Sequence, residues 1–422
     1  MSTARYFILE NDLSFAFPEP RPSSIGGFET RGFNQPGFAP RAAAPFRLPP
    51  TKSSTVEMTA RDAASERTRR GVRVVGRAMP ITLLGSGEKN PPRGAPLSQP
   101  TQPIASDAGI ASWGLGACMA TKSKLDGAGV VVAVLDTGID STHPSFHGVA
   151  INSQDFTGEG NAQDVHGHGS HCAGTIFGRD VNNTRIGVAR GITDALIGKV
   201  IPDQRTGDSG MLFDALNWAS KEGANIVSMS LGFDFPGMIE QLIDEGLPPP
   251  VAASQALVVF SQNLRAFDAL MAGYRAQEPF GRNMLVIAAA GNESKRDPKP
   301  GYTVSVSMPA AAVGVVSVAA YGRNGAKYEI APFSNTDALI CGPGVDILSA
   351  AIGGGLAEMS GTSQACPHVA GIAALWWQKI AAAGGNPTPD KVREQMFAAA
   401  TTAKLPSDAE ETDRGRGRVL AP

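Results

Sequence analysis

Downstream of residue 128 the chain carries continuous apolar runs that are rich in β-branched residues. They read VVVAVLD, ALIGKVI, NIVSMSLG, MLVIAAAGN and VVSVAAY, at residues 130–136, 195–201, 225–232, 284–292 and 315–321. Runs without polar alternation are typical of strands buried on both faces of a parallel sheet. Helical patterns at 210–223 and 363–385 accompany them. The alternation predicts an α/β fold with a doubly wound, mainly parallel sheet and helices on both faces.

A different periodicity fills the interval between the third and fourth runs. Its apolar residues recur at spacings of three and four: Leu257, Phe260, Leu264, Phe267, Met271 and Tyr274. This spacing predicts an apolar stripe on one long helix, so residues 233–282 are expected to form a helical insertion. Amphipathic helices usually bury such a stripe in their own domain. A surface for a partner, or the wall of a cleft, is the alternative.

The N-terminal part has another texture. Residues 1–54 are rich in Pro, Gly, Arg and Ser, which predicts an irregular segment. Farther on, Thr59 can cap a short helix, Gly71 can end it, and the following VRVV can form a strand. Residues 85–108 are Pro-rich and predict an exposed linker. These changes divide the chain into segments 1–54, 55–108 and 109–422.

Composition narrows the function classes. The 422 residues have a net charge of −2, which gives no electrostatic reason to expect nucleic acid or an anionic membrane as a partner. No apolar run approaches the roughly 20 residues of a membrane span, and the start lacks a signal-peptide core. The four cysteines are too few for a disulfide scaffold and favour free thiols. We expect a cytoplasmic protein, although a non-standard export route would leave no mark.

Polar residues of catalytic type follow the predicted buried strands. Asp136 ends the run VVVAVLD, His168 lies in HGHGSHCAGT, Asn292 ends MLVIAAAGN, and Ser363 precedes a predicted helix. In such sheets, chemistry collects where strands end and loops turn into helices. Each residue alone has an ordinary interpretation, as a turn residue, a structural histidine or a helix cap.

Taken together and in order, the motifs DTGID, HGSHCAGT, AAAGN and GTSQACPHVAG resemble those of the subtilases, the subtilisin family of serine proteases. The resemblance covers about residue 110 to the chain end. It implies that Asp136, His168 and Ser363 are a catalytic triad and that the Asn292 amide stabilises the oxyanion. Ser363 would be the nucleophile, His168 its general base, and Asp136 the group that orients the imidazole.

The same resemblance implies the substrate site. An extended peptide would pair with the backbone of Ser230, Leu231 and Gly232. The first specificity pocket would lie beside Ala289, Ala290 and Gly291, whose small side chains predict an apolar or aromatic residue before the cleaved bond. The expected activity is peptide-bond hydrolysis on protein or peptide substrates. Two alternatives stay open: a ligase or macrocyclase with the same triad, and a catalytically silent binding scaffold.

Metal sites are expected to be secondary. His166, His168 and His171 invite a zinc interpretation, but the subtilase motif explains His168 and no further ligand pattern completes the set. No cofactor is required by the resemblance, and the catalytic site is predicted to hold no metal. A structural calcium ion is left open. Ser145 stands where many relatives place a calcium-binding Asp, while Asp180, Asn182 and Asn183 offer oxygen atoms nearby.

Residues around Ser363 depart from the family pattern. Gln364 stands where most relatives carry methionine, which suggests the hypothesis that activity tolerates peroxide better than theirs. Cys172 and Cys366 are both expected to lie near the triad, since each stands within one of these motifs. For each cysteine the simpler interpretation is a small buried hydrophobe.

Subtilases are commonly made as zymogens, and residues 55–84 resemble the end of an inhibitory propeptide. The N-terminal segment is therefore expected to act as an inhibitor of its own chain. Self-cleavage is expected within about 84–112, where composition predicts a linker.

Overall fold

The computed structural model describes residues 3–12, 51–84, 111–204, 206–297 and 300–422. Its centre is an eight-stranded sheet in the order β13-β12-β11-β9-β5-β7-β6, with β14 also paired to β12. The strands are β5 (Val132–Asp136), β6 (Ala150–Asp155), β7 (Asp194–Lys199), β9 (Ile226–Met229), β11 (Leu285–Ala289), β12 (Val315–Asn324), β13 (Lys327–Ile330) and β14 (Ile340–Pro343). All neighbours pair in parallel except β12 and β13.

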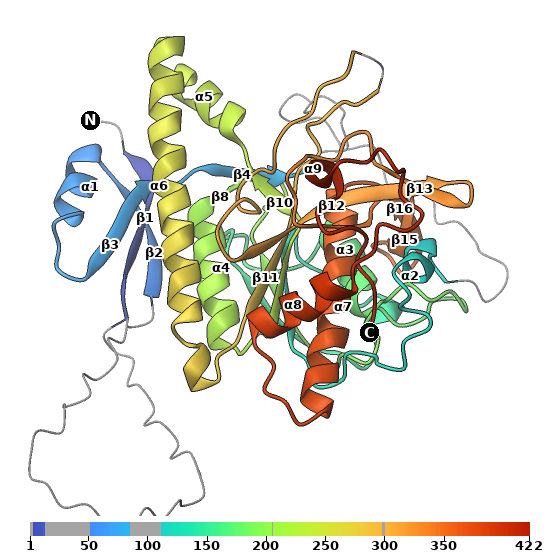
Figure 1. Cartoon of the computed structure of the whole chain (residues 1–422). Coiled ribbons are helices and arrows are strands. Elements are labelled where there is room, and N and C mark those ends of the chain that lie inside the picture. Colours follow the sequence, from blue (N-terminus) through green and yellow to red (C-terminus); the bar gives the residue numbers. More distant parts are fainter. Residues whose placement is uncertain (1–2, 13–50, 85–110, 205, 298–299) are drawn as a thin grey trace, which may run out of the picture.

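Alternating side chains of the central strands feed two apolar cores. In β5, Val132 and Val134 join the core beneath α3 (His168–Phe177) and α7 (Thr362–Ala382). Ala133 and Leu135 join the core beneath α4 (Ser209–Lys221) and α6 (Pro249–Arg275). The predicted doubly wound, mainly parallel sheet with helices on both faces is therefore confirmed (Figure 1).

Shorter elements complete the described chain. The other helices are α1 (Ala60–Glu66), α2 (Trp113–Ala117), η1 (Pro144–Phe146), α5 (Phe235–Asp244), η2 (Glu278–Phe280), α8 (Pro389–Ala399) and α9 (Glu411–Arg414). The other strands are β1 (Ala4–Asn11), β2 (Thr51–Met58), β3 (Val72–Arg77), β4 (Pro80–Leu83), β8 (Thr206–Asp208), β10 (Leu231–Phe233), β15 (Ile347–Ala350) and β16 (Leu356–Met359).

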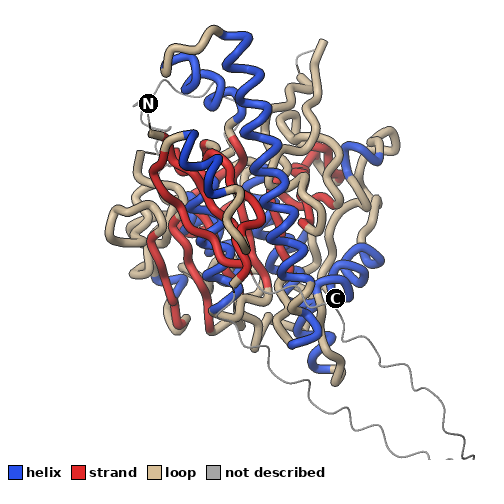
Figure 2. The backbone as a smooth tube through the Cα atoms, turned by 90° about the vertical axis from the view of Figure 1, so that its left-hand side faces the viewer, coloured by secondary structure: helices blue, strands red, loops and turns tan. Residues whose placement is uncertain are grey.

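The N-terminal sheet, formed by β1, β2 and β3 with α1, lies against the outer side of α4 and α6 (Figure 2). Its β1 pairs antiparallel with both neighbours. Phe7 is fully buried, with its ring 4.9 Å from that of Phe213 on α4. The sheet therefore covers part of segment 109–422, which carries the predicted catalytic residues.

The structure agrees only in part with the expectations for the N-terminal part. The predicted irregular segment 1–54 is wrong for residues 4–11 and 51–54, which form β1 and the start of β2. Residues 13–50 and the predicted linker 85–108 lie outside the described residues. Thr59 caps α1 as predicted, but the helix ends at Glu66 and not at Gly71, which stands at a φ of 90° just before β3.

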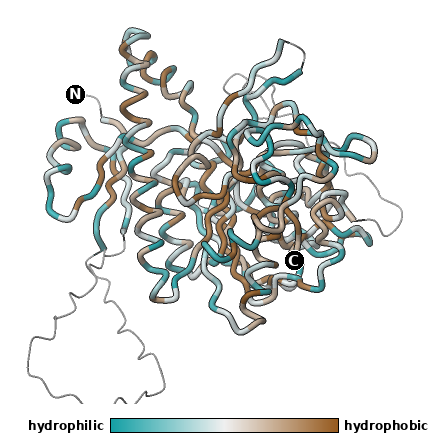
Figure 3. The backbone as a smooth tube through the Cα atoms, in the orientation of Figure 1, coloured by the Kyte–Doolittle hydropathy of each residue, from teal (hydrophilic) through white to brown (hydrophobic). Residues whose placement is uncertain are grey.

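The predicted long helix is α6, within the predicted insertion 233–282. Phe267, Met271 and Tyr274 are buried, so this half of the stripe packs onto the domain as expected. Leu257 differs, because its side chain is 58% exposed. The N-terminal turns of α6 pack against α5 and extend beyond the central sheet. Apolar residues are also found in these N-terminal turns (Figure 3).

Candidate active site

The Asp136–His168 pair lies where β5 ends and α3 begins. Asp136 is the last residue of β5 and is almost fully buried, while His168 is the first residue of α3. The two are joined by a hydrogen bond of 2.8 Å between His168 Nδ1 and Asp136 Oδ1. Asp136 Oδ1 also accepts from the Thr137 N–H over 2.8 Å. The carboxylate can thus fix both the ring orientation and its tautomer.

Burial and charge act in opposite directions on His168. Burial alone disfavours the imidazolium, but the neighbouring Asp136 carboxylate outweighs it and raises the pKa of His168 well above its ordinary value. The pair is therefore suited to accept a proton and to hold it.

Ser363 is the second residue of α7 and lies next to the end of β9. Its hydroxyl donates to Ser230 O over 3.3 Å, and the Ser230 hydroxyl donates to Ser363 O over 2.9 Å. Cys172 links this serine to the histidine: its Sγ lies 3.9 Å from His168 Nδ1 and donates to Ser363 O over 3.5 Å. Gly361 is the N-cap of α7, and a Cβ on this residue would lie 3.1 Å from Asn292 Nδ2.

Asn292 is held in one orientation by the residue before Ser363. Its Oδ1 accepts from both the N–H and the hydroxyl of Thr362, each over 2.8 Å. The Asn292 NH₂ group is thereby left to donate to another acceptor. It donates to the carbonyl oxygen of Leu84 over 3.1 Å.

Leu84 ends a segment that we call the strap, residues 78–84. Within it, β4 pairs antiparallel with β10 on one side and β8 on the other (Figure 1). Leu231 and Gly232, two of the predicted substrate-binding residues, face Leu83 and Thr82 in this ladder. A Cβ on Gly232 would lie 2.5 Å from Leu84 Cδ2, so a larger residue there would displace the end of the Leu84 side chain.

The remaining predicted substrate-site residues directly precede Asn292 in the chain. Ala289 and Leu84 belong to one apolar core cluster, and Ala290 is fully buried. Gly291 donates its N–H to the Thr362 hydroxyl over 3.2 Å. At its φ of 118°, an added Cβ would lie 2.2 Å from Asn335 Nδ2. Asn292, Leu231 and Gly232, which come from separate motifs, are thus brought together at the strap.

Comparison with known proteins agrees with this geometry. The family model described as Subtilase family matches residues 127–418. The chain belongs to the subtilase family.

Individual relatives give the same result. An "Intracellular serine protease" of Paenibacillus polymyxa is 34% identical over 258 residues, which cover 59% of this chain and 67% of the relative. "Subtilisin Savinase" of Lederbergia lenta is 32% identical over 272 residues, covering 63% and 84%. The "Major intracellular serine protease" of Bacillus subtilis (strain 168) is 30% identical over 306 residues, covering 69% and 81%. The chain is a subtilisin-like serine endopeptidase.

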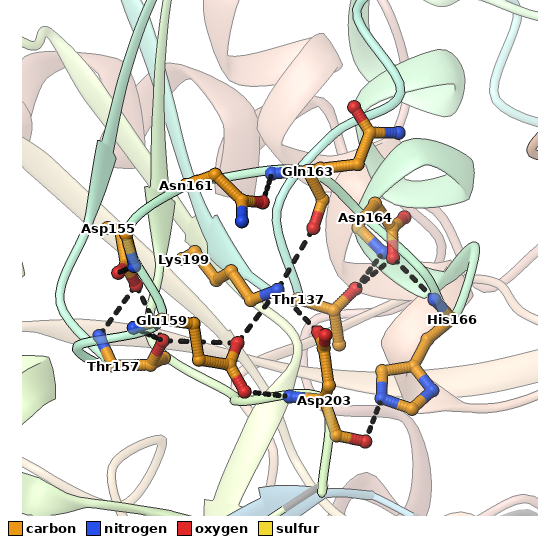
Figure 4. A network of polar contacts seen from close by, with 12 residues as sticks. Thr137, Asp155, Thr157, Glu159, Asn161, Gln163, Asp164, His166, Lys199 and Asp203 are labelled. Carbon is orange, nitrogen blue, oxygen red and sulfur yellow. Dashed lines mark hydrogen bonds and ion pairs between the residues drawn. The ribbon is translucent and has the colours of Figure 1, made fainter.

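Sequence reasoning missed Asp164, which organises the loop before α3 in this subtilase (Figure 4). Its carboxylate accepts from the Thr137 hydroxyl and from the N–H groups of His166, Gly167 and Ser170, over 2.8 to 3.0 Å. A signal was available in the sequence: Asp164 stands four residues before His168, with Gly167 between them, and Asp often stabilises a turn of this kind before a helix.

Lys199 supports the same loop from β7 (Figure 4). Its side chain is 1% exposed, and Nζ forms ion pairs with Glu159 at 3.0 Å and Asp203 at 2.5 Å. It also donates to Gln163 O over 2.9 Å. Because Lys199 is paired in register with Asp136, this network fixes the loop against the strand that ends in the candidate catalytic carboxylate.

The other polar residues of the HGHGSHC motif have structural partners. His171 Nε2 lies 2.8 Å from Ile347 O, and burial lowers the pKa of His171 to about 3. His166 Nε2 lies 2.9 Å from Asp203 O. The Ser170 hydroxyl donates to Asp164 over 2.7 Å. The three histidines thus have separate partners, which argues against the zinc interpretation.

The cysteines divide into two cases. Cys366 is fully buried and lies 3.5 Å from the Ser228 hydroxyl, and burial raises the pKa of its thiol to about 12, so it is a core residue as expected. Cys172 is also buried, but it contacts both His168 and the Ser363 backbone. Asp136, His168 and Cys172 are the one group of potential metal ligands found among the described residues.

The loop considered for calcium is occupied by arginine side chains. Asp180 accepts two hydrogen bonds from Arg190, over 3.0 and 2.9 Å. The Arg185 guanidinium donates to the carbonyl oxygens of Gly187, Val188 and Ala120, over 3.1 to 3.3 Å. The Ser145 hydroxyl lies 2.7 Å from His143 Nδ1. Asp180 and Ser145 thus have partners within the protein, with which a calcium ion at these residues would have to compete.

Membrane insertion has no candidate in the described part of the chain, where every helix is too short or too polar to cross a bilayer.

Proposed function

We propose that Asp136, His168 and Ser363 are the catalytic triad of this endopeptidase, and that the chain is made as a latent precursor that cleaves its own Leu84–Gly85 bond. The observation that carries the proposal is the 3.1 Å hydrogen bond from Asn292 Nδ2 to Leu84 O. An oxyanion donor bonded to one particular carbonyl marks that carbonyl as the one under attack.

The chemistry follows from the contacts. The Ser363 hydroxyl turns from Ser230 O to His168, which takes its proton as the oxygen attacks the Leu84 carbonyl carbon. The negative charge on the carbonyl oxygen is stabilised by Asn292 Nδ2 and by the Ser363 N–H at the start of α7. His168 then gives its proton to the departing amine of Gly85, and water hydrolyses the acyl-enzyme.

The strap supports the latent state. It occupies the strand position between β8 and β10 that an extended substrate would take. Leu84 agrees with the predicted apolar preference for the residue before the cleaved bond. The N-terminal sheet holds the strap in place through its contacts with α4 and α6.

Labelling with a fluorophosphonate probe tests the triad. Mass spectrometry is expected to find the label on Ser363 of the processed enzyme, and Ser363→Ala is expected to lose both the label and casein hydrolysis. Ser170→Ala is the matched control and is expected to keep the label, because its hydroxyl donates to Asp164. Label on Ser170, or none in the wild-type enzyme, would contradict the assignment.

We also propose that folding stability is independent of calcium at residues 178–187, since Arg190 pairs with the Asp180 carboxylate and Arg185 donates to the Gly187 carbonyl oxygen. The melting temperature is expected to be the same with calcium and with a chelator. A fall of several degrees on chelation would contradict this.

An intracellular location is the last part of the proposal. Two relatives are named intracellular serine proteases, and the four cysteines are free and buried. Fractionation of the source cells is expected to leave the protein with the cytoplasm rather than the medium.

A further inference from the structure

The strap is bound well beyond the residues that pair with β10. Pro80 O accepts from the Asp234 N–H over 2.8 Å. Met79 makes two hydrogen bonds with Ser209, through its N–H to the hydroxyl and through its O from the N–H. Counting upstream, Leu84 is the first residue before the cleaved bond and Arg77 is the eighth. Recognition therefore continues along the catalytic domain to Arg77.

Arg77 meets a polar site made by the insertion 233–282. Its guanidinium forms a two-pronged ion pair with Glu245, which directly follows α5; one of the two N–O distances is 3.0 Å. The Arg77 side chain is 15% exposed, so most of it is covered. Hydrogen bonding to Arg77 lowers the pKa of Glu245, and Gln241 supports that carboxylate over 3.2 Å.

Asn263 on α6 forms the second half of this site. Its side chain is fully buried, and Nδ2 donates to Arg77 O over 2.9 Å. Nδ2 also donates to Val259 O, whereas Oδ1 has no hydrogen-bond partner among the described residues. The buried Asn263 Nδ2 thus holds the backbone of Arg77, the residue just before the strap, and can donate to the same carbonyl of an incoming chain.

We propose that Glu245 and Asn263 form an extended subsite that selects substrates with arginine or lysine at the eighth position before the cleaved bond. This rests on the proposed function, since the register follows from Leu84 as the residue under attack. Both residues lie in segment 109–422, so they stay with the enzyme after the N-terminal segment has been cleaved off and has dissociated.

The expected size of the preference is modest. An ion pair whose acid is partly exposed contributes about 0.2–1 kcal/mol, which corresponds to a kcat/KM ratio of about 1.4–5. The preference is also expected to shrink as salt is added, because partly exposed charges are screened.

Two peptides test the subsite on the processed enzyme. Both carry residues 76–84 followed by Gly-Ser-Gly between a fluorophore and a quencher, one with arginine at the Arg77 position and one with its neutral isostere citrulline. We expect kcat/KM to be 1.4–5 times higher for arginine at low salt. The ratio is expected to fall to about 1 in Glu245→Gln. In Glu245→Arg, the ratio of a glutamate to a glutamine peptide is expected to rise above 1.

Asp244→Asn is the matched control, since it removes the same charge from the exposed neighbour and is expected to keep the wild-type ratio. A wild-type ratio of 1, or a ratio that survives Glu245→Gln, would overturn the subsite while leaving the proposed function intact. Failure to cleave either peptide between leucine and glycine would contradict the proposed function, and the subsite with it.

Discussion

The N-terminal segment meets the catalytic domain through two contacts of different character. The strap inserts backbone and apolar side chains: Ile81 is fully buried and β4 is hydrogen-bonded on both sides. The N-terminal sheet instead covers two carboxylates, Asp208 and Asp214, around the Phe7 contact with α4. The strap thus binds like a substrate. The N-terminal sheet is a second binding contact, whose strength depends on the charge of Asp208 and Asp214.

The carboxylates under the N-terminal sheet are shielded from water mainly by β1 and β2. Asp214 accepts from the hydroxyls of Ser53, at 2.5 Å, and Thr55, at 3.3 Å. Asp208 caps α4 and pairs with Arg5 at 2.9 Å. The other ionisable groups that act on them are Glu57 of β2 and Tyr274 of α6. Two neighbouring acids with one partly exposed arginine make this contact unfavourable when both are ionised.

The largest effect is expected from losing the hydrogen bond that Asn292 donates to Leu84, the last residue of the strap. Asn292→Ala removes the donor to Leu84 O and is expected to lower kcat by about 10²–10³, the size that subtilisin shows for the same loss. Self-processing and peptide hydrolysis should slow together. The measurement is single-turnover kinetics on the purified chain. An Asn292→Ala variant that processes itself at the wild-type rate would show that Leu84 O does not become the oxyanion.

The next test changes the residue that fills the pocket. Leu84→Asp places a charge where the leucine is 9% exposed, and self-processing is expected to slow about 10²-fold, because burying an unpaired carboxylate costs several kcal/mol. Leu84→Met is the control and should process normally, since it conserves volume. Time courses on denaturing gels give both rates. Equal rates for the two variants would exclude Leu84 from the pocket.

The sheet contact is expected to depend on pH. Burial raises the pKa of Asp214 and of Asp208 in the complex. A raised carboxyl pKa means that the complex favours the protonated acid, so binding is strongest below the pKa of the free acids, near 3.9, and weakens as pH rises through the raised values. The cleaved N-terminal fragment should therefore leave severalfold more readily at pH 7.5 than at pH 4.5, measured by gel filtration.

Substitutions separate the sheet from the strap in that experiment. Asp214→Asn should retain the fragment at pH 7.5 and flatten the pH dependence. Glu222→Gln, at the far end of α4, is the control and should leave both unchanged. If the fragment binds more tightly as pH rises, the assigned role of the carboxylates is wrong.

The smallest expected effect is at Arg5, whose side chain is 41% exposed. Arg5→Ala removes the cation beside Asp208, and release at neutral pH should quicken by about 1.4–5-fold, the range for an ion pair of 0.2–1 kcal/mol. Added salt should reduce the difference. The same gel-filtration assay measures the release of the fragment. Slower release in Arg5→Ala would contradict the proposal that the Arg5–Asp208 ion pair stabilises the complex.

Sequence patterns predicted β5, β7, β9, β11 and β12 because each contains a continuous apolar run with its own local signal. The sheet's edge strands β6 (AINSQD) and β13 (KYEI) have no such run and were not predicted. The grouping of Asp136, His168, Asn292 and Ser363 also followed from short motifs, and their catalytic roles stay predictions until tested. Pairing over long sequence distances was not readable. The strand β1 is interrupted by polar residues, and its partner β2 begins only at Thr51.

Individual contacts were equally hard to foresee. Leu84 is an ordinary residue in an apolar run, and only the fold brings its carbonyl to Asn292. Leu257 continues the helical stripe in sequence but lies where α6 extends past the sheet, so nothing in the periodicity distinguishes it from Phe267. Arg185 reads as a loop residue until its three carbonyl partners are seen.

N-terminal sequencing of the purified wild-type protein beside Ser363→Ala tests the central claim most directly. The wild-type enzyme is expected to begin at Gly85, and Ser363→Ala to keep the residues before it. A wild-type terminus elsewhere in the chain, or the same uncleaved terminus in both proteins, would contradict the account.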